Sequence, residues 1–330
     1  MKNNLLVCLG IEGTAHTFGV GIITEEGEIL ADEREVYKPT LGKGIVPHEA
    51  RIHHKRVATN ILKNALSKSK LALEDIDIIA YSCGPGLPPP LIFTADFATN
   101  LSEKYKKIFI KVHHGIAHIE ISKLTTQAKD CIILYLSGGH TSVIALVEKR
   151  YRIFGETSDI SVGNCFDVVA REMKLPMPGG AEIEKLAKKG KYVELPYVVK
   201  GMDVSFSGIQ TAAIELLKKG IPKEDIAYSL QETCFAMLTE VTERALAHTG
   251  KEEVLLVGGV AANKRLQEMM KVMCEERGAK LYVVPEKYSG DNGVMIAWVG
   301  LLAYKSGWKP TFKDRIKPKW RIDEVEVTWV

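Results

Sequence analysis

Two histidines, His114 and His118, stand four residues apart in the sequence. On a helix this spacing places both imidazoles on one face, where they can bind the same metal ion. A metal ion needs a third and usually a fourth ligand, and the sequence offers Tyr135 nearby and Asp291 within a Gly-Asp-Asn-Gly stretch. Such a pair can also be hydrogen-bonded or solvated without an ion, so the spacing alone leaves both interpretations open.

Four polar or glycine-containing turns could bind phosphate or a nucleotide. Each follows an apolar run that predicts a strand, and ligands commonly bind at the carboxyl ends of strands in α/β sheets. Backbone N–H groups at such turns can hold an anion. The turns are Glu12 to Thr17, Gly84 to Leu87, Tyr135 to Thr141 and Gly258 to Asn263.

Further polar residues near these turns are candidates for substrate binding. Asn263 precedes a predicted helix through Met273, where its amide can contact a ribose or base, or can only cap the helix. The carboxylates of Asp167 and Glu184 can hold sugar hydroxyls or form salt bridges, and Gly180 permits a sharp turn. Glu12 is the candidate general base.

Composition indicates a globular protein with a large core. The chain has 330 residues, 46% of them hydrophobic, which is typical of about two domains. Its 44 basic and 41 acidic residues give a net charge of +3, which permits a nucleic-acid partner without requiring one. There is no apolar run of transmembrane length, no signal peptide and no Cys-x-x-Cys spacing among the six cysteines. We therefore expect a soluble, cytoplasmic protein.

The predicted elements repeat in outline. Each half begins with three strands and continues with a helix, so a βββα unit occurs twice. The first half has strands at 5–11, 18–24 and 28–33 and a helix from Pro47; the second has strands at 131–136, 141–147 and 151–154 and a helix at 163–173. This pattern predicts an α/β protein of two duplicated domains, 1–130 and 131–330, around a central nucleotide cleft.

Several motifs in order make the chain resemble one enzyme family, the Kae/TsaD/Qri family, which provides the catalytic subunit of archaeal and eukaryotic KEOPS complexes. The resemblance implies the actin/hexokinase-like (ASKHA) fold. It also implies synthesis of N6-threonylcarbamoyladenosine beside the anticodon of ANN-decoding tRNAs. The motifs are Gly10 to His16, Gly84 to Leu87, His114 to His118, Tyr135 to Gly139, Gly201 to Ser207 and Gly258 to Asn263.

The resemblance also implies site residues. A divalent metal, iron ranked first and zinc second, would be held by His114, His118, Tyr135 and Asp291. An adenylate- or ATP-type nucleotide would be held by Tyr135, Leu136, Ser137, Gly138, Gly139, Asp167, Gly180, Glu184 and Asn263. The metal set coincides with the ligands offered by the spacing of the two histidines.

The family reaction would transfer a threonylcarbamoyl group from threonylcarbamoyl-adenylate to the exocyclic amine of adenosine and release AMP. Implied partners are tRNA, a small protein kinase, a dimerising subunit and an accessory subunit, without a membrane. The chain departs from the family pattern at Pro88 to Pro90, at Ile92 and at Val46. These departures affect predicted phosphate-side and tRNA-side contacts.

Two other classes of enzyme remain open from the residues. A small-molecule kinase of the same superfamily would use the phosphate-binding turns equally well, although Mg-ATP does not need the histidine pair. A metalloprotease is the weaker alternative, because Gly115 stands where the His-Glu-x-x-His motif has its glutamate.

The segment from Lys309 to Arg321 is strongly basic. Its six positive residues face one acid, Asp314, and surround Trp320. The segment predicts either a solvated tail or part of a phosphate-binding surface for tRNA. The basic residues are Lys309, Lys313, Arg315, Lys317, Lys319 and Arg321.

Overall fold

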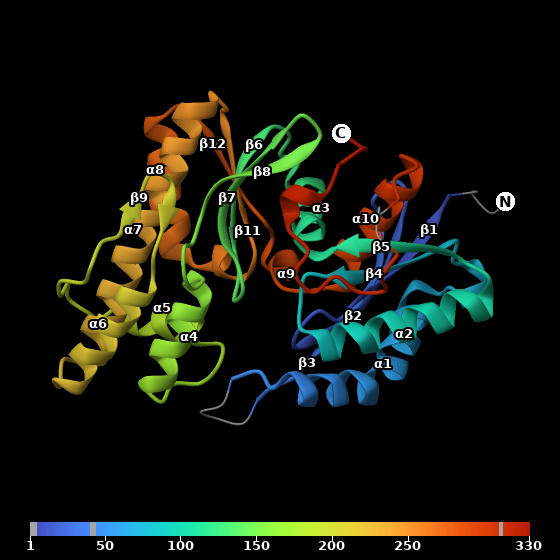
Figure 1. The fold of residues 1–330 in the computed structure, drawn as a ribbon, viewed down its shortest axis with the longest axis horizontal. Helices are drawn as coiled ribbons and strands as arrows, with labels where there is room; N and C mark the ends of the chain where they lie inside the picture. The colour runs from blue at the N-terminus through green and yellow to red at the C-terminus, as the bar shows by residue number, and fades with distance from the viewer. Residues whose placement is uncertain (1–4, 40–43, 310–312) are drawn as a thin grey trace. The chain divides into compact units, whose positions relative to one another are not determined.

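The computed structural model describes residues 5–39, 44–309 and 313–330, and the chain forms two compact units (Figure 1). Unit 1 contains Met1–Leu124, Glu148–Tyr151 and Gly290–Val330. Unit 2 contains Thr125–Val147 and Arg152–Ser289. The boundary expected near residue 130 is close to the first crossing, whereas the return of the last segment to unit 1 was not expected.

Unit 1 is built on a five-stranded mixed sheet with the order β3-β2-β1-β4-β5. β1 pairs antiparallel with β2 and parallel with β4, which in turn pairs parallel with β5. Its strands are β1 (Val7–Glu12), β2 (Thr17–Thr24), β3 (Ile29–Val36), β4 (Ile78–Gly84) and β5 (Ile108–His113). Its helices are α1 (Pro47–Ser69), α2 (Pro88–Tyr105), most of α3 (His114–Thr126) and α10 (Gly293–Lys305).

Helices cover both faces of the unit 1 sheet. Phe18 of β2 points to one face, where its ring meets His54 of α1 and Phe93 of α2. Gly21 of the same strand points to the opposite face, against the backbone of Val294 in α10. Because side chains alternate along a strand, α10 and the α1/α2 pair sandwich the sheet.

Unit 2 repeats this plan with a sheet of order β12-β11-β6-β7-β8. β6 pairs antiparallel with β7 and parallel with β11, which pairs parallel with β12. Its strands are β6 (Cys131–Leu136), β7 (Thr141–Val147), β8 (Arg150–Glu156, entering unit 2 at Arg152), β11 (Glu253–Val257) and β12 (Lys280–Val283), with a short pair β9 (Val199–Lys200) and β10 (Asp203–Val204). Its helices are α4 (Val162–Glu172), α5 (Gly179–Ala187), α6 (Ser207–Lys218), α7 (Lys223–Thr249), α8 (Lys264–Glu276) and α9 (Glu286–Ser289).

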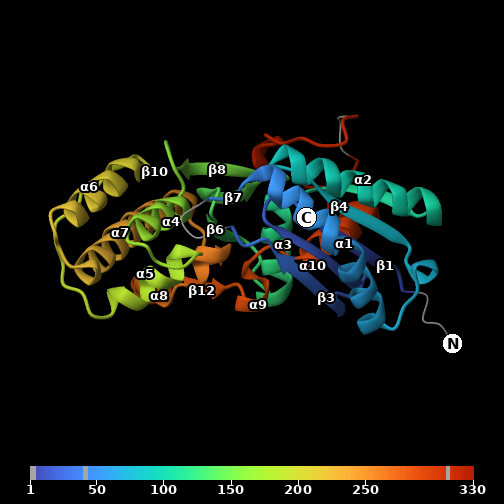
Figure 2. The ribbon, with the colours of Figure 1, turned by 90° about the horizontal axis from the view of Figure 1, so that it is seen from below.

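The two sheets correspond strand for strand, which confirms the duplication predicted from the sequence. Each has three strands in an antiparallel meander followed by two parallel strands at the other edge. In unit 2 the core lies between one face of β6 and helices that include the long α7 (Figure 2). That face of β6 carries Ile132, Leu134 and Leu136, so Tyr135 points to the other face.

Two other features concern the chain as a whole. Among the described residues, no helix has the length and apolar character needed to cross a membrane. All six cysteines are buried thiols, and none of them forms a disulfide. α2 begins at Pro88, because proline fits the first turn of a helix, where its missing N–H costs no hydrogen bond.

Candidate metal centre and nucleotide site

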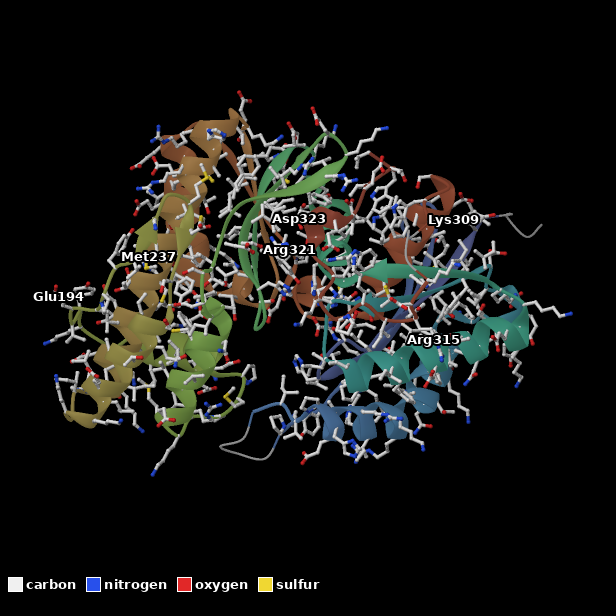
Figure 3. The ribbon with its side chains drawn as sticks, in the orientation of Figure 1. Glu194, Met237, Lys309, Arg315, Arg321 and Asp323 are labelled. Atoms are coloured by element: carbon white, nitrogen blue, oxygen red, sulfur yellow. The ribbon has the colours of Figure 1, made fainter. Side chains whose placement is uncertain are left out.

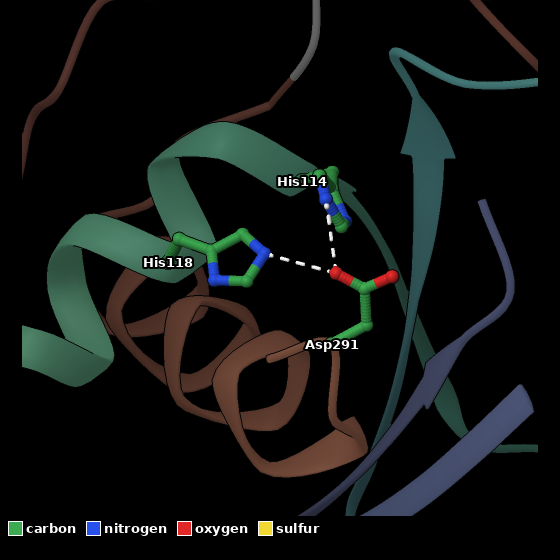
Figure 4. A group of neighbouring side chains, drawn as sticks. All are labelled: His114, His118 and Asp291. Carbon is green, nitrogen blue, oxygen red and sulfur yellow. Dashed lines mark hydrogen bonds and ion pairs between the residues drawn. The ribbon is translucent and has the colours of Figure 1, made fainter. Parts of the chain in front are cut away.

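Three side chains of unit 1 converge on one point. α3 begins at His114 and carries His118 one turn later, and Asp291 stands just before α10 (Figure 4). Asp291 Oδ1 lies 3.2 Å from His118 Nε2 and 3.6 Å from His114 Nε2. One ligand atom from each of the three residues lies within 4.8 Å of the others. The structure therefore brings together three of the four predicted metal ligands.

Glu12 lies behind His114 rather than in an open site. Its side chain is fully buried, and Oε2 contacts His114 Nδ1 at 3.1 Å. Oε1 accepts the N–H and the hydroxyl of Thr14 at 2.8 and 2.6 Å. A carboxylate on the far nitrogen of a histidine holds the ring so that the other nitrogen, here Nε2, faces a metal.

Glycines hold Asp291 in position by allowing α10 to touch the sheet. A Cβ on Gly293 would lie 2.1 Å from the backbone nitrogen of Gly21, and one on Gly10 would lie 2.2 Å from that of Ala297. Asn292 caps α10 through Met295 N, and Arg34 donates to the Asp291 carbonyl at 3.0 Å. The start of α10 is therefore fixed against β1 and β2.

The electrostatics of the triad favour a positive charge at its centre. Burial alone would lower the pKa of His114, but the charge and hydrogen bond of Glu12, with help from Asp291, raise it to about 9. Burial lowers the pKa of His118. Burial opposes ionisation of Asp291, yet the hydrogen bond from His118 and the charge of His114 lower its pKa. Two imidazoles, one carboxylate and a supporting carboxylate fit a divalent cation.

Tyr135, the fourth predicted ligand, belongs to unit 2. It is buried near the end of β6, and its ring stacks on His140 at 5.5 Å between centroids. Beyond it, Leu136 ends the strand and the turn with Ser137 and Gly138 begins. Whether Tyr135 joins His114 as a ligand remains a prediction.

The turn after β6 is closed by its own hydrogen bonds. Ser137 N donates to the His140 carbonyl at 2.8 Å, and Ser137 Oγ accepts the N–H groups of Gly139 and His140 at 3.3 and 3.0 Å. Gly138 N has no partner among the described residues. Phosphate binding by the turn would therefore use this N–H or the Ser137 hydroxyl.

Several glycines of the predicted nucleotide site face open space. A Cβ on Gly138, Gly139, Gly180 or Gly259 would meet no atom within 4 Å, and none of these residues has the left-handed backbone that favours glycine. Packing therefore does not explain them, whereas close approach of a ligand would. Gly258 differs, because its φ is +93° and a Cβ would lie 2.2 Å from the Leu136 carbonyl.

Two other predicted substrate residues of unit 2 accept hydrogen bonds from backbone N–H groups at the starts of helices. Asp167 Oδ1 accepts Gly179 N at 2.8 Å, which holds the start of α5 beside Gly180. Glu184 Oε1 accepts Lys264 N at 2.8 Å, next to Asn263. Glu184 therefore contacts the first residue of α8, directly after Asn263, and binding of one adenosine by both residues stays a prediction.

Sequence reasoning missed two residues that support this site. Ser161 caps α4 and donates from Oγ to the Gly138 carbonyl at 2.6 Å. Gln231 of α7 accepts the Asn263 amide at 3.0 Å. A serine three residues before Asn164 is a helix-start signal that could have indicated the first. No local pattern marks the second, because its contact depends on packing between α7 and α8.

The basic C-terminal segment is partly neutralised within unit 1. Arg315 pairs with Asp96, Lys317 with Glu324 and Arg321 with Asp323. Figure 3 labels Arg321 near Asp323. Lys309, Lys313 and Lys319 are exposed and form no ion pair among the described residues, and positions 310–312 lie outside that range. Three of the six basic residues are therefore without an ion pair in the described part of the chain and could contact phosphate.

A family model described as TsaD, tRNA N6-adenosine threonylcarbamoyltransferase, matches residues 27–298. A Thermococcus kodakarensis tRNA N6-adenosine threonylcarbamoyltransferase is 53% identical over 98% of this chain and all of the relative. A probable bifunctional tRNA threonylcarbamoyladenosine biosynthesis protein of Methanocaldococcus jannaschii is 55% identical over 98% of this chain, which spans 61% of that relative's length.

Solved structures of low identity share the fold. HypF of T. kodakarensis aligns with a TM-score of 0.62 at 18% identity, over 91% of this chain and 48% of HypF. The (R)-2-hydroxyglutaryl-CoA dehydratase component A of Acidaminococcus fermentans aligns with a TM-score of 0.57 at 14% identity, over 90% and 98% of the two chains. These likenesses confirm the predicted actin/hexokinase-like fold. Since the family model covers most of the chain and the relatives are more than half identical to it, the chain belongs to the family of tRNA N6-adenosine threonylcarbamoyltransferases.

Proposed function

We propose that this chain transfers a threonylcarbamoyl group from threonylcarbamoyl-adenylate to N6 of the adenosine beside the anticodon of ANN-decoding tRNAs. The family match over residues 27–298 is the observation that carries this proposal. The triad of His114, His118 and Asp291 supports it, because neither alternative enzyme class accounts for it. A kinase acting through Mg-ATP does not need imidazole ligands. A metalloprotease needs a free glutamate, whereas Glu120 on α3 accepts the Tyr151 hydroxyl at 2.5 Å.

The resident metal is proposed to be Fe²⁺, with Zn²⁺ second. Two histidines and one carboxylate form the donor set of many non-haem iron sites, and Tyr135 is the proposed fourth ligand. When bound, a divalent ion would supply positive charge that orients and polarises an oxygen of the substrate. Glu12 is proposed to hold His114 in the ligating orientation, since both its oxygens are engaged; its role as a general base stays a prediction.

The nucleotide portion of the substrate is proposed to bind in unit 2. The open glycines after β6, at the start of α5 and after β11 leave room for backbone to approach a phosphate or ribose. Asp167, Glu184 and Asn263 would contact the ribose and base from the helices that they cap or support. Leu136 contributes backbone at the end of β6.

The proposed reaction is an acyl transfer. The exocyclic amine of adenosine attacks the carbamoyl carbon, a C–N bond forms, the bond from that carbon to the phosphate oxygen breaks, and AMP leaves while the amine loses a proton. Gly138 N–H and the Ser137 hydroxyl would stabilise charge on the departing phosphate. The proposed macromolecular partners are tRNA and the KEOPS subunits, namely a small protein kinase, a dimerising subunit and an accessory subunit, and the proposed location is the cytoplasm.

Modified nucleoside formation tests the function directly. Threonylcarbamoyl-adenylate is supplied to the full chain together with KEOPS subunits and an ANN-decoding tRNA, and the digested tRNA is measured by mass spectrometry. We expect threonylcarbamoyladenosine that disappears when the target adenosine is replaced by guanosine. Absence of product, together with phosphate transfer from ATP to small metabolites, would support the kinase alternative.

Alanine at Asn263 or Glu184 is expected to weaken adenylate binding. Each substitution would remove a neutral or charge-assisted hydrogen bond between the protein and the ligand, which lowers the affinity by about threefold to thirtyfold. Calorimetric titration of AMP measures the change. Glu182 stands on the same helix and pairs with Lys185 on the surface, so Glu182→Ala is the matched control. Unchanged affinity in both site variants would remove them from the nucleotide site.

The exposed lysines of the C-terminal segment are expected to contribute to tRNA binding. Replacing Lys309, Lys313 and Lys319 with serine should make the slope of log affinity against log salt shallower by about 0.7 to 0.9 for each phosphate that the protein no longer neutralises. A filter-binding series over salt concentration, with the accessory subunits present, measures the slope. Metal content and AMP affinity should stay unchanged.

A variant with the same loss of charge elsewhere serves as the control. Lys188, Lys218 and Lys219 are exposed lysines of unit 2, and their replacement with serine removes three charges without touching the segment. Equal slopes in wild type and the C-terminal variant would make the basic segment a tail without a role in tRNA binding.

A further inference from the structure

The side-chain amide of Asn263 is held from two sides at the start of α8. Its Oδ1 accepts the N–H of Leu266 at 3.2 Å, which is the helix-capping contact. Its Nδ2 donates to Oε1 of Gln231 at 3.0 Å. Because a backbone N–H can only donate, the amide oxygen must face Leu266 and the amide nitrogen must face Gln231. The orientation of Asn263 therefore follows from hydrogen-bond chemistry.

Gln231 is a buried polar residue of α7. Its neighbours Leu230 and Cys234 are wholly buried, and Gln231 itself is only 5% exposed. A buried amide costs free energy unless its polar atoms find partners, and Asn263 provides one. An apolar side chain of similar length would pack as well, so the contact with Asn263 is what distinguishes glutamine here.

The two contacts determine what Asn263 can offer to a ligand. Its Nδ2 carries two hydrogens, of which one goes to Gln231. The second has no protein partner among the described residues. Asn263 is 7% exposed, beside the open Gly259 and next to Lys264, whose N–H is held by Glu184. The side chain therefore has one N–H donor left for a ligand.

We infer that Gln231 is a positioning residue that fixes the Asn263 amide so that its free N–H meets an acceptor atom of the adenylate. The acceptor is a ring nitrogen of the adenine or a hydroxyl oxygen of the ribose. This inference rests on the proposed function, because it requires that Asn263 lies in the nucleotide site. Gln231 on α7 would thus favour, through Asn263, ligands that have an acceptor atom at one position.

A panel of AMP analogues tests the inference. Each analogue lacks one acceptor: 1-deaza, 3-deaza and 7-deaza AMP lack a ring nitrogen, and 2′-deoxy and 3′-deoxy AMP lack a hydroxyl. Binding is measured by calorimetry on the full chain for wild type, Gln231→Met and Gln231→Glu. Thr233 of α7 is the control, because its hydroxyl is buried without a hydrogen-bond partner and Thr233→Val leaves Asn263 untouched.

Wild type is expected to bind one analogue about threefold to tenfold more weakly than AMP. Gln231→Met should bind AMP more weakly by a similar factor and should no longer distinguish that analogue. Gln231→Glu keeps an acceptor and should keep the discrimination, as should Thr233→Val.

Three results would overturn the inference. Gln231→Met could keep the wild-type discrimination, or it could weaken all analogues equally with a lower melting temperature, which would indicate a purely structural role. Wild type could bind all analogues as well as AMP, which would remove the donor role of Asn263 and leave the site intact. Failure of wild type to bind AMP at all would instead overturn the proposed nucleotide site and, with it, the inference.

Discussion

His118→Ala is expected to lose most of its bound metal. The side chain supplies one of three ligand atoms that lie within 4.8 Å of one another, and it contacts Asp291 at 3.2 Å. Loss of a supporting residue outside a metal site typically costs tenfold to a hundredfold in affinity, so loss of a ligand should cost roughly tenfold or more. Elemental analysis after loading with Fe²⁺ or Zn²⁺ and gel filtration measures the metal content. His114→Ala should behave in the same way.

His48 provides the control for loss of a histidine. It is exposed on α1, so His48→Ala should keep the wild-type metal content. Glu12→Gln should fall between the two, because it removes the charge behind His114 and keeps its shape. Wild-type metal content in a variant lacking both His114 and His118 would exclude this group as the metal site.

Gly293→Ala is expected to destabilise unit 1 strongly. A Cβ there would lie 2.1 Å from the nitrogen of Gly21 and 2.4 Å from the carbonyl carbon of Val20. Both are backbone atoms of a central strand, so neither can move aside as a side chain would. Overpacking of this kind costs about 3 kcal/mol, at the upper end of its usual range. Urea unfolding followed by circular dichroism measures the free energy of unfolding.

The same variant should also lose metal, because Asp291 stands two residues before Gly293. Gly290→Ala is the matched control on the other side of Asp291, since a Cβ there meets no atom within 4 Å. It should unfold at the wild-type urea concentration and keep its metal. Equal stability of the two variants would show that α10 does not depend on its glycine contact with β2.

Local patterns predicted the parts of this fold that depend on local physics. Alternating and apolar runs located the strands that became β1, β2 and β6, and Pro47 marked the start of α1. The spacing of His114 and His118 predicted one helical face for both imidazoles, and the structure has them there. These signals involve residues only a few positions apart.

Contacts between distant residues carried no such signal. Asp291 reaches His118 across 173 positions; the Gly-Asp-Asn-Gly stretch marked it as a candidate ligand, but no local pattern indicated that it lies beside the two histidines. Glu12 was predicted as a candidate base, and the sequence does not reveal that β1 ends behind His114, where both carboxylate oxygens of Glu12 have partners. The role of Gln231 could not be predicted from the sequence, since a glutamine on a long helix is usually solvated.

The return of residues 290–330 to unit 1 determines the order of events during synthesis. In a nascent chain, β1 and β2 are synthesised early, and the sheet face that carries Gly10 and Gly21 has no helix packed on it at that stage. The helix that packs on this face, α10, is translated only after the whole of unit 2. Unit 2 has its own core and can fold on the ribosome before unit 1 is complete. Asp291 arrives with α10, so incomplete translation products cannot assemble the triad. An ion held by all three residues of the triad could therefore bind only to chains that have been translated past Asp291.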